Sequence, residues 1–296
     1  MKVPIIDLRD PDQEQLKNLD AACRDHGFFL LRNHGIDSEI EEMWKASKWF
    51  FNLPREEKIK ILRTEENPLG FYDRELTKRK RDLKEVFDFI EPRPEREDIN
   101  QWPEQEDFKR SLEVFFDAAS RIAEETLSLV FSALKKDSDY SLPVGDTHTS
   151  TVRLNYYPVG DPLSKEEQEG VNKLGDMALH HHTDAGVLTV LLQDSTGGLE
   201  AFVDGNWIDV TPIEGALIIN VGDMMQVWSN DRFTAALHRM QPVITQPRYS
   251  IPFFFNHSYD TDYAPLPTPD STSPKYRTIN WEEFRQARAD GDYADF

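Results

Sequence analysis

The amino-acid sequence predicts a mainly β protein with α-helices, in which a helical N-terminal portion packs on a β-sandwich or barrel. The chain has 296 residues, of which 39% are hydrophobic, so it can bury a sizeable core. Apolar residues recur at helical spacing in its first third, whereas short β-type runs crowd the part after residue 150. Many short strands in one block favour a sandwich or barrel over a doubly wound parallel sheet.

The N-terminal part is expected to contain two helices with a strand between them. Residues 11–27 show apolar positions at helical spacing, and Gly27 ends that pattern. The following residues, "FFLLRNHG", predict a short buried strand and a turn, and residues 37–54 predict a second amphipathic helix. Residues 63–90 lack a clean period, and a long helix is expected from about Asp107 to Leu134.

Beyond residue 150 the apolar residues change to a strand-like pattern. The runs expected to form strands are "TVRLNYY", "GVLTVLL", "LEAFV", "NWIDV", "ALIIN", "MMQVW" and "YSIPFFF". Gly, Asn, Asp or Pro separates several of them, as turns require. Near the C-terminus a Pro-, Ser- and Thr-rich loop precedes "NWEEFRQARADGD", which predicts a last surface helix.

Composition narrows the class of partner and compartment. The chain has 34 Lys and Arg against 54 Asp and Glu, a net charge of −20, which argues against binding to nucleic acid or to an anionic membrane surface. The single cysteine, Cys23, excludes an intramolecular disulfide and a cysteine-rich zinc site, as expected in a reducing cytoplasm. The start, "MKVPIIDLRD", is too short an apolar run for a signal peptide, and no stretch approaches the roughly 18 apolar residues of a membrane span. We expect a soluble, cytoplasmic protein.

Residues 178–186 read "ALHHHTDAG", with three consecutive histidines close to an aspartate. In an extended chain the side chains at i and i+2 point the same way, so His182 and Asp184 can converge on one metal ion. By the same parity His181 faces away, and His180 lies farther along the strand from Asp184. The roles of these two histidines stay open. The pair needs a further ligand from elsewhere in the chain.

The remaining histidines are His26, His34, His148, His238 and His257. His238 stands in "AALHRMQPV", later in the β block, where a neighbouring strand could bring it beside His182 and Asp184. Two histidines and one carboxylate on one face of an octahedral ion leave three positions open, the arrangement expected for non-haem Fe(II). Zinc with the same ligands stays chemically possible.

Ten residues after His238, the run "RYS" places Arg248 and Ser250 on one face of a strand. The planar guanidinium matches the two oxygens of a carboxylate, and the hydroxyl donates a further hydrogen bond. Upstream, "RLNYYP" offers Asn155 and Tyr157, again of one parity, as additional polar donors. Such residues otherwise simply face solvent, but together they describe a metal beside a carboxylate-binding pocket.

The motifs together resemble the iron- and 2-oxoglutarate-dependent dioxygenases of the isopenicillin-N-synthase-like group. They are "RLNYYP", "HTDAGVLTVLLQD", "GGLEAF", "NWIDVTPIEGALIINVGDMMQVWSND", "HRMQPV" and "RYSIPFFF". "VPIIDL" and "GFFLLRNHGI" resemble the N-terminal region of the same family. The resemblance implies a double-stranded β-helix (jelly-roll) core. It divides the chain into an N-terminal dioxygenase region, 1–105, and a long helix with the catalytic core, 106–296, whose motifs lie within 150–257.

The resemblance also implies the site and the reaction. The implied iron ligands are His182, Asp184 and His238, and the implied contacts of 2-oxoglutarate are Arg248, Ser250, Asn155 and Tyr157. With Fe(II), 2-oxoglutarate and O₂, such an enzyme oxidises a small organic substrate and forms succinate and CO₂. Hydroxylation, desaturation and cyclisation are all outcomes known in the family.

Several residues and segments have two possible roles. Strand parity from the Arg-Ser pair extends to Phe254, which faces either a substrate pocket or the ordinary core. In similar proteins the segments that hold Phe71 and Phe87 contribute to the pocket. Segment 159–178 is either a lid or a passive loop. The basic run from Lys78 to Arg81 is either a solvated charge run or a site for an anionic substrate.

Three alternative functions stay open from the residues. One is an Fe(II) oxidase on the same scaffold that does not use 2-oxoglutarate. Another is a non-catalytic small-molecule binder with a vestigial metal site. The third is a hydrolytic zinc enzyme, for which a built carboxylate clamp has no use.

Overall fold

The structure is a computed structural model that describes residues 3–77, 79–91, 99–134, 149–267 and 273–290. Its largest element is an eight-stranded sheet whose neighbours are all antiparallel except the first pair, which is parallel. In spatial order its strands are β1 (Ile5–Asp7), β2 (Phe28–Arg32), β12 (Leu217–Val221), β9 (Leu188–Gln193), β14 (Arg248–Phe255), β7 (Thr151–Tyr157), β6 (Glu85–Ile90) and β3 (Gly70–Tyr72).

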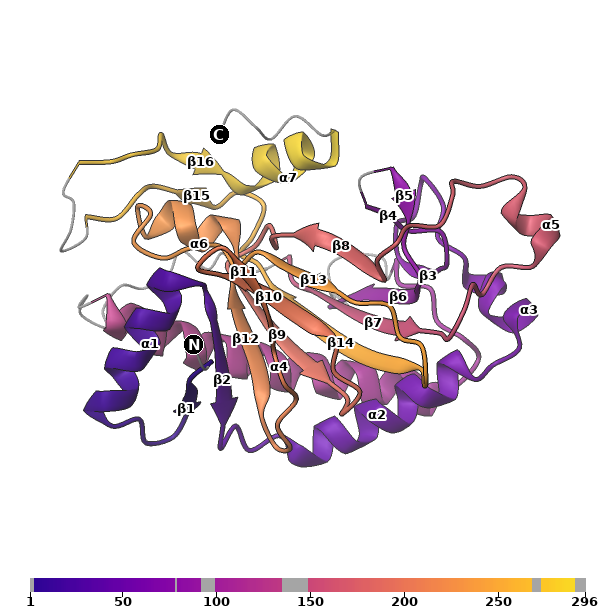
Figure 1. Ribbon diagram of the computed structural model, residues 1–296, viewed down its shortest axis with the longest axis horizontal. Coiled ribbons are helices and arrows are strands. Elements are labelled where there is room, and N and C mark those ends of the chain that lie inside the picture. Colours follow the sequence, from indigo (N-terminus) through magenta and orange to yellow (C-terminus); the bar gives the residue numbers. More distant parts are fainter. Residues whose placement is uncertain (1–2, 78, 92–98, 135–148, 268–272, 291–296) are drawn as a thin grey trace.

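A four-stranded antiparallel sheet lies over the large one (Figure 1). In spatial order its strands are β11 (Asn206–Asp209), β10 (Leu199–Val203), β13 (His238–Met240) and β8 (Leu179–His182). The two facing sheets make the double-stranded β-helix, so the predicted mainly β fold class is confirmed. Two short ribbons complete the strands: β4 (Leu76–Thr77) with β5 (Lys80–Arg81), and β15 (Asp262–Tyr263) with β16 (Ile279–Asn280).

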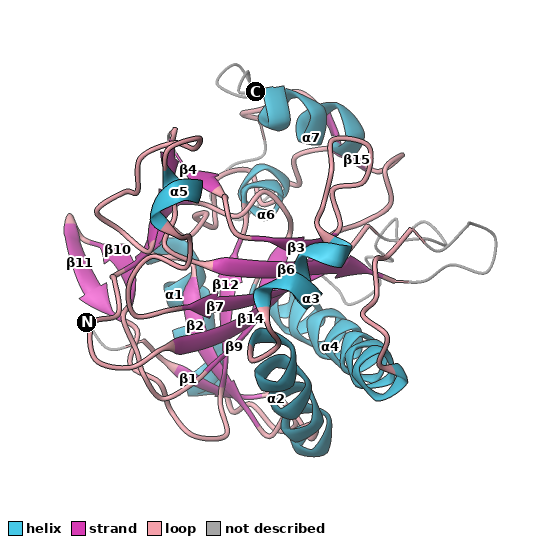
Figure 2. Ribbon diagram, turned by 90° about the vertical axis from the view of Figure 1, so that its right-hand side faces the viewer, coloured by secondary structure: helices cyan, strands magenta, loops and turns pink. Residues whose placement is uncertain are grey.

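Three long helices flank the large sheet. They are α1 (Gln13–Asp25), α2 (Asp37–Phe51) and α4 (Glu106–Ala133), close to where the sequence predicts them. Figure 2 shows α2 and α4 side by side below the strands. The shorter helices are α3 (Arg55–Lys58), the 3₁₀ turn η1 (Ile59–Ile61), α5 (Lys165–Gln168), α6 (Asp223–Trp228) and α7 (Trp281–Asp290). No helix in the described part of the chain is long and apolar enough to cross a membrane.

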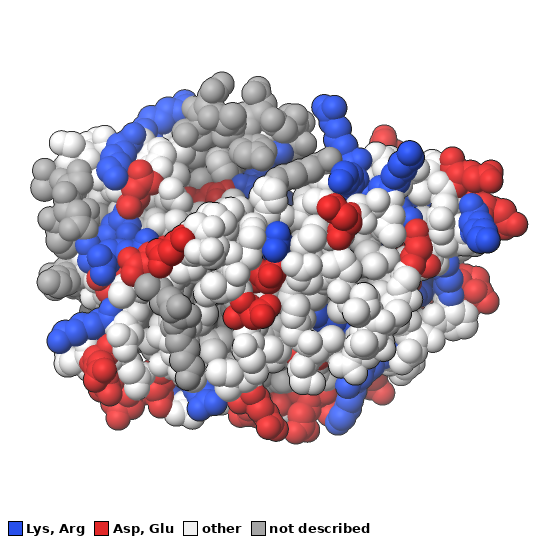
Figure 3. All heavy atoms as spheres, viewed as in Figure 1, with Lys and Arg blue, Asp and Glu red and all other residues white. Residues whose placement is uncertain are grey.

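The large sheet is buried on both faces, and strand parity divides its side chains between two cores. In β2, Phe29 and Leu31 join the core shared with the helices, whereas Phe28 and Leu30 join the core between the two sheets. Both faces therefore require apolar residues, which is why this strand is an unbroken apolar run rather than an alternating one. At the surface, acidic side chains gather along the lower edge of the face in Figure 3, in keeping with the net charge of −20.

One local prediction is wrong, and one segment without a prediction forms regular structure. The run "MMQVW" forms helix α6 instead of a strand, because a short apolar run with all-round burial has no period that separates the two states. Residues 63–90, for which no regular element is predicted, contribute β3 and β6 to the large sheet. The first 105 residues thus supply four strands of that sheet, and both regions of the chain build one structure.

Gly27 fixes the approach of α1 and β2 to the segment before β13, and we expect Gly27→Ala to destabilise the fold strongly. Its φ is +70°, and an added Cβ would overlap the carbonyl oxygen of Thr234. Gly205 is a matched control, since its φ is +79° but nothing lies within 4 Å of an added Cβ. The control should lose about 1–2 kcal/mol through backbone strain alone, whereas Gly27→Ala should lose roughly 1–3 kcal/mol more through the clash. Equal losses in urea unfolding would contradict this account.

Candidate active site

The structure brings together the three residues predicted to bind metal. His238 on β13 pairs directly across from His182 on β8, and Asp184 follows two residues after that strand. The Nε2 atoms of His182 and His238 lie 3.8 and 3.9 Å from Asp184 Oδ1. One ligand atom from each of the three residues lies within 4.8 Å of the others. We call these residues the His-Asp-His cluster.

Backbone carbonyls fix both imidazoles in the tautomer that a metal needs. His182 Nδ1 donates to the carbonyl of His180 at 2.9 Å, and His238 Nδ1 donates to the carbonyl of Ala236 at 2.9 Å. A carbonyl oxygen only accepts, so each Nδ1 carries the proton and each Nε2 keeps a free lone pair. Both lone pairs belong to the nitrogens nearest Asp184.

The two carboxylate oxygens of Asp184 also have different roles. Its Oδ2 accepts hydrogen bonds from Thr189 Oγ1 at 2.5 Å and Asn220 Nδ2 at 2.8 Å, which leaves Oδ1 for an ion. Burial by itself would raise the pKa of Asp184, but the neighbouring His238 and His182 together with these two hydrogen bonds hold it below its ordinary value. The cluster therefore favours an ionised carboxylate.

Burial and the neighbouring His238 lower the pKa of His182 to about 3, so its imidazole is neutral near pH 7. A neutral imidazole and an ionised carboxylate are the forms that bind a divalent cation. Neither Thr189 nor Asn220 is indicated by the sequence pattern, because each lies on a different strand and reaches Asp184 only in the folded sheet.

The other two histidines of the triplet take no part in this cluster. His181 is exposed on the opposite side of β8, where its ring lies 6.2 Å from that of Trp207. His180 is buried on the same side as His182, but its Nε2 lies 3.1 Å from Asp176 Oδ1 and its Nδ1 3.6 Å from Asp82. Strand parity thus separates the three histidines as the sequence indicates.

A cavity of about 360 Å³ beside the His-Asp-His cluster contains all four residues predicted to hold the cosubstrate. They are Arg248, Ser250, Asn155 and Tyr157. On the paired strands β14 and β7, Arg248 faces Tyr157 and Ser250 faces Asn155. The predicted parity therefore places the four side chains on one cavity wall.

Arg248 is a buried cation without an ion-pair partner among the described residues. It is 2% exposed and donates to the amide oxygen of Gln193 at 3.0 Å, and no carboxylate of the described residues forms an ion pair with it. Burial is the main cause of the shift in the pKa of Arg248, which it lowers. Its Nε and the Oδ1 of Asn155 are both buried without a hydrogen-bond partner in the described structure. An isolated buried charge is costly unless an anion pairs with it, so this wall fits a ligand carboxylate.

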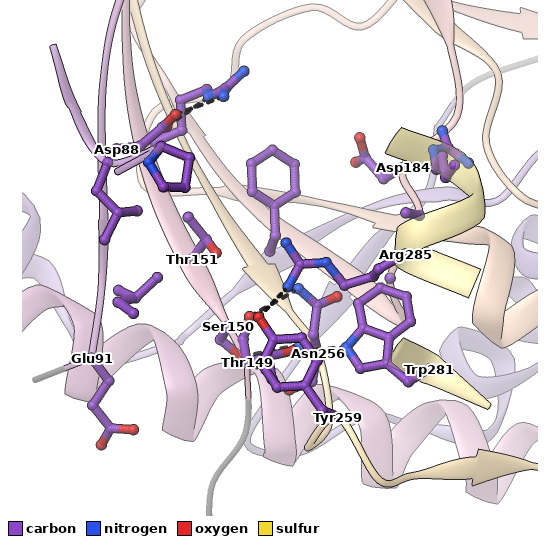
Figure 4. Close-up of a pocket in the computed structure, with 18 of the residues that line it drawn as sticks. Asp88, Glu91, Thr149, Ser150, Thr151, Asp184, Asn256, Tyr259, Trp281 and Arg285 are labelled. Carbon is purple, nitrogen blue, oxygen red and sulfur yellow. Dashed lines mark hydrogen bonds and ion pairs between the residues drawn. The ribbon is translucent and has the colours of Figure 1, made fainter. Parts of the chain in front are cut away.

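A larger cavity of about 830 Å³ adjoins the first. The two share His182, Asp184, Arg153, Phe254 and Arg288 on their walls. Figure 4 shows the larger cavity between Asp88, Glu91 and Thr151 on one side and Trp281 and Arg285 on the other, with Asp184 beyond them.

Of the three phenylalanines predicted to line a substrate pocket, the structure places one at the cavities and two in the core. Phe254 lines both cavities. Phe71 and Phe87 are fully buried and pack against Phe50, so they belong to the aromatic core and line neither cavity. Strand β6, which holds Phe87, does reach the larger cavity, but with its opposite face: Asp88 and Ile90 line it.

A charged network on the cavity walls is absent from the sequence predictions. Arg153 donates two hydrogen bonds of 2.7 Å to the carboxylate of Asp88 and one of 3.2 Å to Glu75. Arg63 lies 2.5 Å from Glu75 and Lys84 lies 3.9 Å from it. Charged residues inside the apolar strands "RLNYY" and "EVFDF" are the signal that could have indicated such a network, because strand charges with both faces covered must pair.

Segment 159–178 is attached to the N-terminal part of the chain. Asp161 pairs with Arg81, which is 2% exposed, and Glu167 lies 2.8 Å from Arg55. Arg81, within the predicted basic run, is thus a buried structural cation rather than a solvated one. Lys78 lies outside the described residues.

Comparisons with known proteins agree with this geometry. A family profile described as the 2OG-Fe(II) oxygenase superfamily matches residues 148–257, and one described as non-haem dioxygenase in morphine synthesis N-terminal matches residues 3–105. The Arabidopsis thaliana Protein DMR6-LIKE OXYGENASE 2 is 31% identical over 95% of this chain and 82% of its own length. The chain belongs to the 2OG-Fe(II) oxygenase superfamily. As a member it is an oxidoreductase, a dioxygenase that depends on Fe(II), 2-oxoglutarate and O₂.

Two further relatives extend the likeness over almost the whole chain. The 2-oxoglutarate-Fe(II) type oxidoreductase hxnY of Emericella nidulans is 30% identical over 88% of this chain and 80% of its own. Among solved structures, a full-length Neurospora crassa protein crystallised in complex with alpha-KG superposes with a TM-score of 0.80 at 29% identity. The match covers 97% of this chain and 95% of that one. The family expectation formed from the sequence is confirmed.

We expect Glu75→Gln to lower the free energy of unfolding at pH 7 by roughly 2–3 kcal/mol, because three basic side chains lose their counter-charge. The pKa of Glu75 is lowered from 4.5 to about 2: burial raises it, but the cations outweigh burial, Arg153 first, then Lys84 and Arg63. A carboxyl with a depressed pKa stabilises the folded state fully above its unfolded pKa. That stabilisation is lost as the pH falls from about 5 towards about 2.

Urea unfolding at pH 7, 5 and 3 checks this prediction. The variant should lose less stability than the parent between pH 5 and pH 3. Glu42→Gln, an exposed residue of α2, is the control and should follow the parent curve. Parallel pH profiles for Glu75→Gln and the parent would contradict the depressed pKa.

Proposed function

We propose that the His-Asp-His cluster holds the Fe(II) of this dioxygenase. The donors fit the ion: two imidazole nitrogens and one carboxylate oxygen, each preset by a hydrogen bond on its other atom. The smaller cavity reaches all three residues, and the larger one reaches His182 and Asp184. When bound, iron and 2-oxoglutarate supply with O₂ an oxidative decarboxylation that forms succinate and CO₂ and oxidises the substrate.

We infer that the smaller cavity receives 2-oxoglutarate, with its distal carboxylate at Arg248 and Ser250. The observation that carries this proposal is the buried guanidinium of Arg248, which lacks a carboxylate partner among the described residues and shares its cavity with the cluster. The planar fork of Arg248 matches a carboxylate, and the Ser250 hydroxyl donates beside it. Asn155 and Tyr157, on the facing strand, complete the wall as further polar contacts.

The larger cavity is the proposed substrate site. Its volume of about 830 Å³ suits a small organic molecule, and it reaches His182 and Asp184 directly. Phe254 stands on the boundary of both cavities and is placed to hold the substrate against the cluster while keeping water from the gap.

The buried pair of Arg248 and Ser250, which fits a carboxylate, favours an enzyme that uses 2-oxoglutarate. It disfavours an Fe(II) oxidase that does not use 2-oxoglutarate and a zinc hydrolase. All three predicted ligands and the clamp are present, which also disfavours a vestigial binder. The cytoplasmic location expected from the single cysteine stays a prediction.

Binding measurements on four variants test this division of roles. Arg248→Gln should weaken 2-oxoglutarate binding by about 100-fold, since a charge-assisted pair to a buried group contributes roughly 3 kcal/mol, while Fe(II) affinity stays within a few fold. His182→Ala and Asp184→Ala should lose Fe(II) binding itself. His181→Ala is the matched control, because this neighbouring imidazole faces away and should leave both affinities unchanged.

Anaerobic isothermal titration calorimetry with Fe(II), followed by 2-oxoglutarate, measures both affinities in one sample. Equal loss of iron in Arg248→Gln and His182→Ala would contradict the proposed roles. Iron loss in His181→Ala would contradict the parity assignment.

A further inference from the structure

Four arginines line the larger cavity, and one of them differs from the rest. The four are Arg63, Arg153, Arg285 and Arg288. Three have carboxylate partners: Arg63 with Glu75, Arg153 with Asp88, and Arg288 with Asp223. Arg285 forms no ion pair with any carboxylate of the described residues and instead contacts a hydroxyl and two aromatic rings. It is therefore the cavity cation whose charge the described part of the protein leaves available.

Arg285 is nevertheless held in a defined position. Its Nη1 donates to the Tyr259 hydroxyl at 2.8 Å, and its guanidinium carbon lies 5.4 Å from the Tyr259 ring centre and 5.7 Å from the Trp281 ring centre. Trp281 is in turn fixed, being 1% exposed and donating to Thr149 Oγ1 at 2.7 Å. In Figure 4 the Arg285 side chain extends between Trp281 and Ser150 into the cavity. Within the described residues, its donor nitrogens Nε and Nη2 stay free for a ligand.

Helix α7 ties this cation to the metal cluster. Residues 281, 285 and 288 are four and three positions apart, so they share one face of the helix, and all three line the cavity. Arg288 bonds both Asp223 and the carbonyl of Thr183, the residue between His182 and Asp184. The helix that presents Arg285 is thus anchored on the loop that carries the cluster.

We propose that Arg285 binds the carboxylate of the substrate, and that the substrate is a small organic acid with an apolar or aromatic body. The proposal rests on the proposed function, since it assigns the substrate of the same site. The cavity that Arg285 and the cluster share also has apolar lining residues, among them Leu69, Ile90 and Phe254. A planar guanidinium and apolar side chains in one cavity with the metal cluster fit an amphipathic carboxylate, with the carbon to be oxidised remote from the acid group.

The test compares acids with their uncharged amides. The probes are phenylacetate, 3-phenylpropionate and trans-cinnamate, each beside its primary amide, titrated anaerobically into the Fe(II) and 2-oxoglutarate complex by calorimetry. At least one acid should bind tenfold or more tightly than its amide. Arg285→Gln should remove that preference, and Arg285→Lys should restore part of it, because lysine keeps the charge but loses the fork.

Glu283→Gln is the matched control, since it removes a charge from an exposed residue of the same helix that does not line the cavity. It should keep both the preference for acids and the affinity for 2-oxoglutarate. Equal affinity for acids and amides, no detectable binding of any acid, or a preference that survives in Arg285→Gln would overturn the assignment. Loss of 2-oxoglutarate binding together with acid binding in Arg285→Gln would overturn it too, because a general effect of α7 would then explain both.

The two proposals fail separately. A parent protein that does not bind 2-oxoglutarate contradicts the proposed function. One that binds 2-oxoglutarate but does not prefer acids contradicts only the role of Arg285.

Discussion

The antiparallel register of β8 and β13 is the constraint on which the active site depends. It sets His238 opposite His182, and side chains of such a pair start only about 4.5–5.5 Å apart. Two imidazoles held by a rigid sheet can therefore bind the same ion. A slip of one residue would turn one imidazole to the other face. Apolar side chains between the two sheets, such as Leu199 and Met240, oppose that slip because it would expose them.

The polar groups around the cluster follow from that geometry. Each ligand atom is left free because its partner atom is already bonded, to a carbonyl in the histidines and to Thr189 and Asn220 in Asp184. On one side lies a small cavity lined by Arg248, a buried cation that has no ion-pair partner in the described part of the chain. On the other lies a larger cavity, which α7 borders with a second available cation, Arg285. The cluster thus stands between two cavities, and each is lined by an arginine that has no ion-pair partner among the described residues.

Sequence reasoning reaches what strand parity and residue chemistry determine locally. The positions of His182 and Asp184, the wall of Arg248 and Ser250, and the long helix α4 all follow from spacing along one element. It does not reach features that need the fold. Strand β6 escapes prediction because Glu85 and Asp88 interrupt its apolar pattern, and only Lys58 and Arg153, distant in sequence, explain how these charges are buried. The position of Arg285 in the cavity wall likewise cannot be predicted from the sequence, because it depends on how α7 packs.

The most direct test of the account is an anaerobic absorption titration of the metal-free protein with Fe(II) and then 2-oxoglutarate, which needs no knowledge of the substrate. The account predicts a weak visible charge-transfer band that develops only when both are present, since the keto acid must bind the iron held by the cluster. Iron binding without that band would contradict the placement of 2-oxoglutarate beside Arg248, and failure to bind iron would contradict the role of the cluster itself.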